Sequence, residues 1–152
     1  MKRVEVKLNL EVVAPLLDVI KAAADDLRPK LAVDPQLPSE DAEFAVAWTR
    51  ELLEAQNSDV VFFLALFDAE FFTEGVIVLD SPNSEPILRA CSAVRLRLRE
   101  KYLLPLGDEA LESGEVAAER MTAEQRQAFG AYVFLANLQE LIVQHLDPTE
   151  ME

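Results

Sequence analysis

The chain opens with a strict alternation of apolar and polar residues. Residues 3–8 follow a period of two, which predicts a short strand with one buried face. From Asn9 the period becomes helical, and the Asn9 side chain is well placed to cap a helix that begins at Leu10. Pro15 lies inside this helical pattern, so the helix either starts near Ala14 or bends at the proline.

A proline-containing connector over residues 29–38 leads to the next helical pattern. Ser39 and the two acids that follow it are typical of a helix start, and we expect a helix from Asp41 to about Gln56. Its spacing places four apolar side chains on one stripe, namely Phe44, Trp48, Leu52 and Ala55. The polar sequence at 57–59 predicts a break in the chain and a new cap.

An apolar run over residues 60–67 is compatible with a buried strand or a buried helix. Because the pattern continues through residues 68–72, we favour a central helix. After Gly75, residues 76–79 either continue that helix or form a second strand. A strand there would give residues 3–8 the pairing partner that an isolated strand lacks.

Two more helices are predicted toward the carboxyl end. One starts at Ser84 and carries an apolar stripe of Ile87, Cys91, Val94, Leu98 and Tyr102. Residues 103–121 have the composition of a mobile acidic loop, with a short helix at 109–112. Residues 122–125 then form a capping box, and a largely apolar helix follows to Leu146. A helix of that composition is buried on most sides, in the core or in a subunit interface.

These elements predict a mainly α protein: a single-domain bundle of about five helices with a short N-terminal strand. We expect the domain to span residues 1–147 and residues 148–152 to form a disordered tail. At 152 residues, the length is typical of one domain.

The charge along the chain is uneven. The formal net charge is −14. Residues 31–88 hold one base against twelve acids, a net charge of −11, and residues 102–152 hold two bases against ten acids. Between them, residues 89–101 carry five bases and one acid. The overall sign argues against nucleic-acid and anionic-membrane partners. The basic segment favours an ion-pair network within the chain or between subunits.

Several function classes are excluded by composition. The chain has four glycines, one cysteine and one histidine, and it carries no phosphate-binding loop, nucleophile elbow or zinc signature. We therefore expect no enzyme activity, no metal and no cofactor. The lone cysteine, Cys91, lies on an apolar stripe and is expected in the core. The absence of an apolar leader and the unpaired Cys91 favour a cytoplasmic protein.

Arginine forks bind carboxylates and phosphates well, so the basic segment also holds the candidate binding residues. Arg95 and Arg99 are one helical turn apart, and Glu140 on the last helix is the acid we expect to pair with them. The candidate site is therefore Arg95, Arg99 and Glu140.

Two segments carry a resemblance to a known family. The sequence of residues 92–98, an acidic loop, and the sequence of residues 132–143 together resemble an uncharacterised, mostly helical bacterial domain-of-unknown-function family best known from actinobacteria. The likeness covers roughly residues 84–147 and the Val-x-Val-x-Leu opening. Ala93-Val94 stand where that family usually has Asn-Asp. The resemblance implies a helical fold and no particular activity.

From this we hypothesise a non-enzymatic protein-interaction or regulatory protein that acts as a homodimer or binds another protein. The alternative is a small-molecule or anion-binding protein, or a minor enzyme, that uses Arg95 and Arg99.

Overall fold

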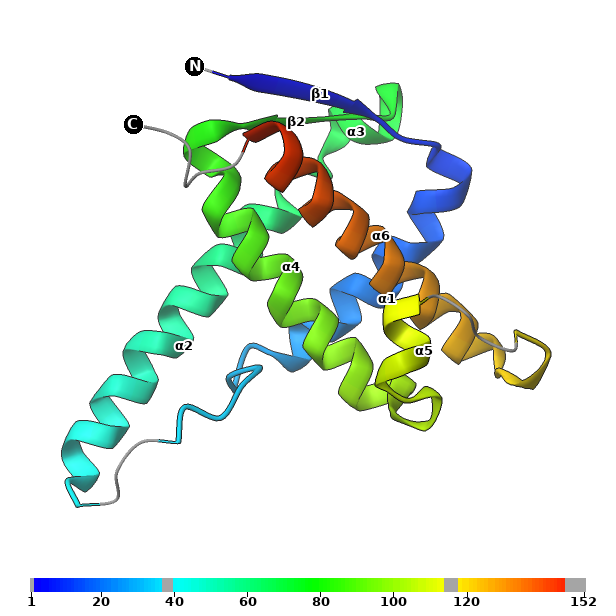
Figure 1. Ribbon diagram of the computed structural model, residues 1–152. Helices are drawn as coiled ribbons and strands as arrows, with labels where there is room; N and C mark the ends of the chain where they lie inside the picture. Colours follow the sequence, from blue (N-terminus) through cyan, green and yellow to red (C-terminus); the bar gives the residue numbers. More distant parts are fainter. Residues whose placement is uncertain (1, 37–39, 114–117, 147–152) are drawn as a thin grey trace.

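The computed structural model describes residues 2–36, 40–113 and 118–146 (Figure 1). These residues form six α-helices: α1 (Leu10–Asp26), α2 (Ala42–Leu64), α3 (Ala69–Glu74), α4 (Ser84–Leu98), α5 (Asp108–Ser113) and α6 (Ala123–Leu146). Two strands, β1 (Arg3–Lys7) and β2 (Val76–Asp80), form one small sheet. The prediction of a mainly helical protein with a short N-terminal strand is confirmed.

The sheet pairs the amino-terminal strand with a strand near the middle of the chain. β1 and β2 pair antiparallel, with Val4 opposite Leu79 and Val6 opposite Ile77. Residues 60–79 are therefore not one helix but two helical segments followed by a strand. Gly75 makes the reversal at φ +71°, and its carbonyl accepts a hydrogen bond from the Leu8 amide. A Cβ at position 75 would lie 2.9 Å from the Leu8 carbonyl oxygen, which explains why glycine occupies this turn.

Helix α4 lies at the centre of the bundle and packs against α1, α2 and α6. Its apolar stripe is fully buried from Ile87 to Leu98 and includes Cys91. Desolvation raises the pKa of the Cys91 thiol to about 12, so this cysteine behaves as the core residue predicted. After Leu98 the chain continues through a π-helical turn over Arg99–Leu103.

The helix starts follow the local sequence closely. Asn9 caps α1 by accepting a hydrogen bond from the Glu11 amide, and α1 runs through Pro15 without starting again. Thr122 and Gln125 exchange two hydrogen bonds as a capping box at the start of α6. Ser39, the predicted start of the second helix, lies outside the described residues; the observed cap there is Asp41.

The predicted break at residues 57–59 is wrong, because α2 continues through it to Leu64. Two of the three polar side chains there bond to other parts of the fold and leave the helical backbone intact. Asn57 donates to the carbonyl of Arg28, and Asp59 accepts from Arg89. The new helix start falls at Asp68, whose carboxylate caps α3.

Helix α2 extends well beyond the rest of the bundle (Figure 1). From Ala42 to Asp59 it has no buried side chain, and Val60 is its first buried residue. Trp48, which lies on the apolar stripe predicted for this helix, is 41% exposed and so is not a core residue. Phe62 and Phe72 are also exposed, whereas Phe63, Phe67 and Phe71 form a buried aromatic cluster.

The remaining predictions fall partly outside the structure. The short helix in the acidic loop is α5, and residues 114–117 of that loop are not described. The predicted tail, residues 148–152, also lies outside the described residues. Within the described ranges, none of the helices combines the length and the apolar composition that crossing a membrane requires.

Candidate functional site

The basic side chains of α4 and the turn after it connect this helix to its neighbours. Arg89 binds Asp59 of α2 through two hydrogen bonds of 2.9 and 3.1 Å. Arg97 and Lys101 both bind one carboxylate oxygen of Asp26, at 3.1 and 2.9 Å. The expected ion-pair network therefore exists within the chain, and it ties α4 to α1 and α2.

The group formed by Asp26, Arg97 and Lys101 is the densest of these networks. The hydrogen bond from Lys101, followed by that from Arg97, lowers the pKa of the Asp26 carboxyl below its usual value. The same contact with Asp26 raises the pKa of Lys101. Asp26 therefore favours the folded state in its charged form.

This network predicts a pH-dependent contribution to stability. Asp26→Asn is expected to lower the free energy of unfolding by about 1 kcal/mol at neutral pH, since Asp26 is only partly exposed. Because the folded pKa of Asp26 lies below the unfolded value, the difference is present above pH 3.8 and disappears as the pH falls through the folded pKa. Urea unfolding at several pH values measures it.

Asp25→Asn is the matched control, because Asp25 is more exposed and contacts only Arg28 at 3.4 Å among the described ion pairs. We expect it to change stability little at any pH. An equal loss in both variants would show that the Asp26 network has no special role.

The predicted site residues are only partly brought together. The Arg95 guanidinium donates to the side-chain oxygen of Gln139 at 2.8 Å and lies 4.5 Å from the centre of the Tyr132 ring. Gln139 in turn donates to Ser92 and to the Leu88 carbonyl. Arg99 lies one turn further on, half-buried at the start of the π-helical turn.

Glu140 does not take the predicted position. It is exposed and accepts a hydrogen bond from Gln144, and within the described part of the chain no ion pair joins it to Arg95. Consecutive residues of a helix point about 100° apart, so Gln139 faces α4 while Glu140 faces away. The Nε atom of Arg95 is buried and has no hydrogen-bond partner among the residues that the structure describes.

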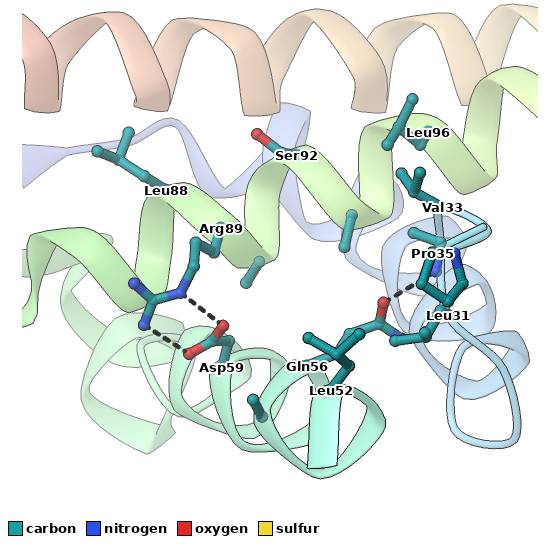
Figure 2. Close-up of a pocket in the computed structure, with 14 residues that line it drawn as sticks. Leu31, Val33, Pro35, Leu52, Gln56, Asp59, Leu88, Arg89, Ser92 and Leu96 are labelled. Atoms are coloured by element: carbon teal, nitrogen blue, oxygen red, sulfur yellow. Dashed lines mark hydrogen bonds and ion pairs between the residues drawn. The ribbon is translucent and has the colours of Figure 1, made fainter. Parts of the chain in front are cut away.

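A separate feature lies beside α4, where sequence reasoning placed no site. A cavity of about 560 Å³ lies between α2, α4 and the connector after α1. Figure 2 shows it with the Arg89–Asp59 pair at one end and the connector at the other. The walls are mainly apolar and include Leu31, Val33, Pro35, Leu52, Leu88 and Leu96. Neither Arg95 nor Arg99 lines it.

One glutamine holds the connector against α2 and so shapes the cavity. The Gln56 side chain accepts from the Ala32 amide at 2.9 Å and donates to the carbonyls of Leu27 and Lys30. Two of the three backbone atoms that Gln56 contacts belong to the connector, and the third is the carbonyl oxygen of Leu27, the C-cap residue of α1. The polar groups of Gln56 are thus used within the chain, and the cavity remains an apolar space.

The apolar stripe predicted on α2 continues the cavity wall outward. Leu52 and Ala55 line the cavity, and Trp48 and Phe44 follow on the same side of the helix toward its amino end. The Phe44 and Trp48 rings are stacked, with centroids 6.2 Å apart and planes 9° apart. We call the cavity wall and this stripe together the α2 surface. The 3.6-residue spacing was a correct signal for the stripe but did not reveal that its outer half is exposed.

Other evidence for a function class is limited. No family model, curated protein or solved structure matches the chain. In the part of the chain that the structure describes, no group of three or more His, Cys, Asp and Glu side chains is arranged to hold a metal ion. The α2 surface is the candidate functional site that the geometry provides.

Proposed function

We propose that this chain is a non-enzymatic protein-interaction protein of the cytoplasm, that it acts as a homodimer, and that it uses the α2 surface. The observation that carries the proposal is the exposure of Phe44 and Trp48 on a helix with no buried side chain from Ala42 to Asp59. Large exposed apolar groups that adjoin a groove mark interaction sites, and tryptophan dominates binding energy at such sites.

The exposure of the apolar stripe on the outer part of α2 supports the same conclusion. Isolated helices shorter than about 12–15 residues are marginal in water, and most helices gain their stability by packing an apolar face. The outer part of α2 has an apolar stripe on which Phe44 and Trp48 remain 54% and 41% exposed. A binding partner would supply the missing contact.

The alternative function, an anion site at Arg95 and Arg99, has less support. The Arg95 guanidinium already donates to Gln139 and stacks on Tyr132. Its unpartnered Nε is buried, so an anion would have to displace these contacts to reach it. The chain also brings no acid–base pair to the α2 surface beyond Arg89 and Asp59, which neutralise one another.

The test is the mass of the purified chain in solution. Static light scattering coupled to gel filtration is expected to give twice the 17.0 kDa of one chain, with a monomer fraction that grows on dilution. A mass of one chain across the whole concentration series would contradict the proposed homodimer.

A further inference from the structure

Three of the α2 residues that line the cavity belong to a longer line of residues with the spacing of a coiled coil. Apolar positions that alternate at intervals of three and four residues form the contact line between two paired helices. On α2 this spacing is continuous through six residues, which we call the seam: Ala45, Trp48, Leu52, Ala55, Asp59 and Phe62. Asp59 is the one charged member, and its bidentate pair with Arg89 neutralises it.

The charges of α2 are arranged so that a second acidic chain can approach the seam. The positions that flank the seam hold Thr49 and Gln56 on one side and Glu51 and Ser58 on the other. The acids Glu43 and Glu54 lie on the opposite face of the helix, by the rotation of 100° per residue. Between Ala45 and Phe62 the flanking positions therefore hold a single acid, Glu51, although the net charge of the chain is −14.

We propose, on the basis of the proposed function, that the occupant of the α2 surface is a second copy of this chain whose α2 pairs antiparallel along the seam. A basic partner helix would find only Glu51 beside the seam, whereas a second copy brings the same uncharged line. A closed two-fold pair also places equal surfaces in contact, as homodimers require.

The antiparallel direction follows from the position of α2 in the fold. The amino-terminal half of α2 is uncovered, and the carboxyl-terminal half packs on α4 beside the cavity. In an antiparallel pair, each uncovered half lies against the covered half of its partner. A parallel pair would leave both cavities open and place the two outer halves only against each other.

The spacing of the seam sets the contacts within the pair. Maximum overlap places Leu52 opposite the partner's Ala55 and Trp48 opposite the partner's Asp59. The indole of Trp48 then lies at the mouth of the partner's cavity, beside the Arg89 guanidinium that binds Asp59. A guanidinium over an indole face is a favourable cation–π contact, so Trp48 of each copy would complete the apolar wall of the other.

Engineered cysteines test the direction and register of the pair. In the antiparallel seam, position 51 neighbours position 58 of the partner, and both Glu51 and Ser58 are exposed. The double variant Glu51→Cys/Ser58→Cys is expected to form a covalent dimer on mild oxidation, seen on non-reducing gels. The two cysteines of one chain are about 10 Å apart along the helix, beyond the reach of a disulfide.

The single variants Glu51→Cys and Ser58→Cys are the controls, and the covalent dimer should be lost in each. The unmodified chain should not cross-link either, because its only cysteine, Cys91, is buried. Circular dichroism confirms that the variants fold.

The result also separates this inference from the proposed function. If light scattering gives a dimer and the double variant forms no disulfide, the homodimer stands and the antiparallel seam is wrong. If the chain remains a monomer, both fall.

Discussion

Replacing Phe44 and Trp48 together by alanine is expected to raise the Kd of the dimer by about a hundredfold or more. Buried aromatic residues at interfaces contribute about 2 kcal/mol or more each, the contributions of neighbouring residues do not add, and a hundredfold change in Kd corresponds to about 2.7 kcal/mol. Both residues are about half exposed in the single chain, at 54% and 41%, so their removal does not open a hole in its core. Sedimentation equilibrium over a concentration series measures the change, and thermal unfolding checks that the fold remains.

Val46→Ala is the matched control for this experiment. Val46 lies on the same uncovered half of α2 and is 60% exposed, but it points away from the seam. We expect it to leave the Kd within about threefold of the original value, as for apolar surface residues outside a hot spot. If Val46→Ala weakened the dimer as much as the double variant, the α2 stripe would not be the interaction surface.

The second large effect concerns the buried aromatic cluster that supports α3 and the carboxyl end of α2. Phe71→Ala is expected to lower the free energy of unfolding by about 3–5 kcal/mol, a large part of the stability of a typical domain. Phe71 is fully buried, and its ring is edge-on to Phe67 with centroids 5.1 Å apart. Replacing the Phe71 side chain by a methyl group leaves a cavity in the core, and the short helix α3 cannot shift enough to fill that cavity. Urea unfolding at a fixed chain concentration measures the loss.

The adjacent Phe72 supplies the control. It is the same residue type on the same helix, but it is 48% exposed, and its ring meets that of Phe71 edge-on with centroids 5.1 Å apart. Phe72→Ala is expected to cost about 1 kcal/mol. Comparable losses in the two variants would mean that burial at position 71 does not determine the stability of this end of the molecule.

The parts of the fold that depend on neighbouring residues could be predicted. Asn9 caps α1, and Thr122 and Gln125 cap α6, because a side chain bonds a backbone amide two or three residues away. The stripe from Ile87 to Leu98 likewise reports burial through spacing alone. Such signals need no knowledge of which element lies across the interface.

The predicted break in α2 failed for the complementary reason. Asn57 and Asp59 are typical of helix ends, since their side chains compete for the local backbone. Here both are bound by distant groups, the Arg28 carbonyl and the Arg89 guanidinium. Nothing near residues 57–59 in the chain shows that these partners exist.

The candidate site also has one part that could be predicted from the sequence and one part that could not. Charge patterning indicated correctly that the basic segment would pair with acids of the chain, but it named Glu140 as the partner of Arg95. A rotation of α6 by one residue, about 100°, would bring position 140 instead of position 139 to face α4. The packing of α6 against its neighbours fixes this rotation. The cavity between α2, α4 and the connector could not be predicted, because its walls come from three separate segments.

Amino-acid order alone determined the helical class, the caps of α1 and α6, the buried stripe of α4 and the apolar stripe of α2, since each depends on contacts within a few turns. The tertiary structure decided which half of that α2 stripe is covered. Leu52 and Ala55 lie beside α4, whereas Phe44 and Trp48 extend past the end of the bundle. Periodicity shows which face of a helix is apolar, but only the packing of the folded chain shows how much of that face a neighbouring element covers. In α2, α4 covers the inner half of the stripe and leaves the outer half exposed.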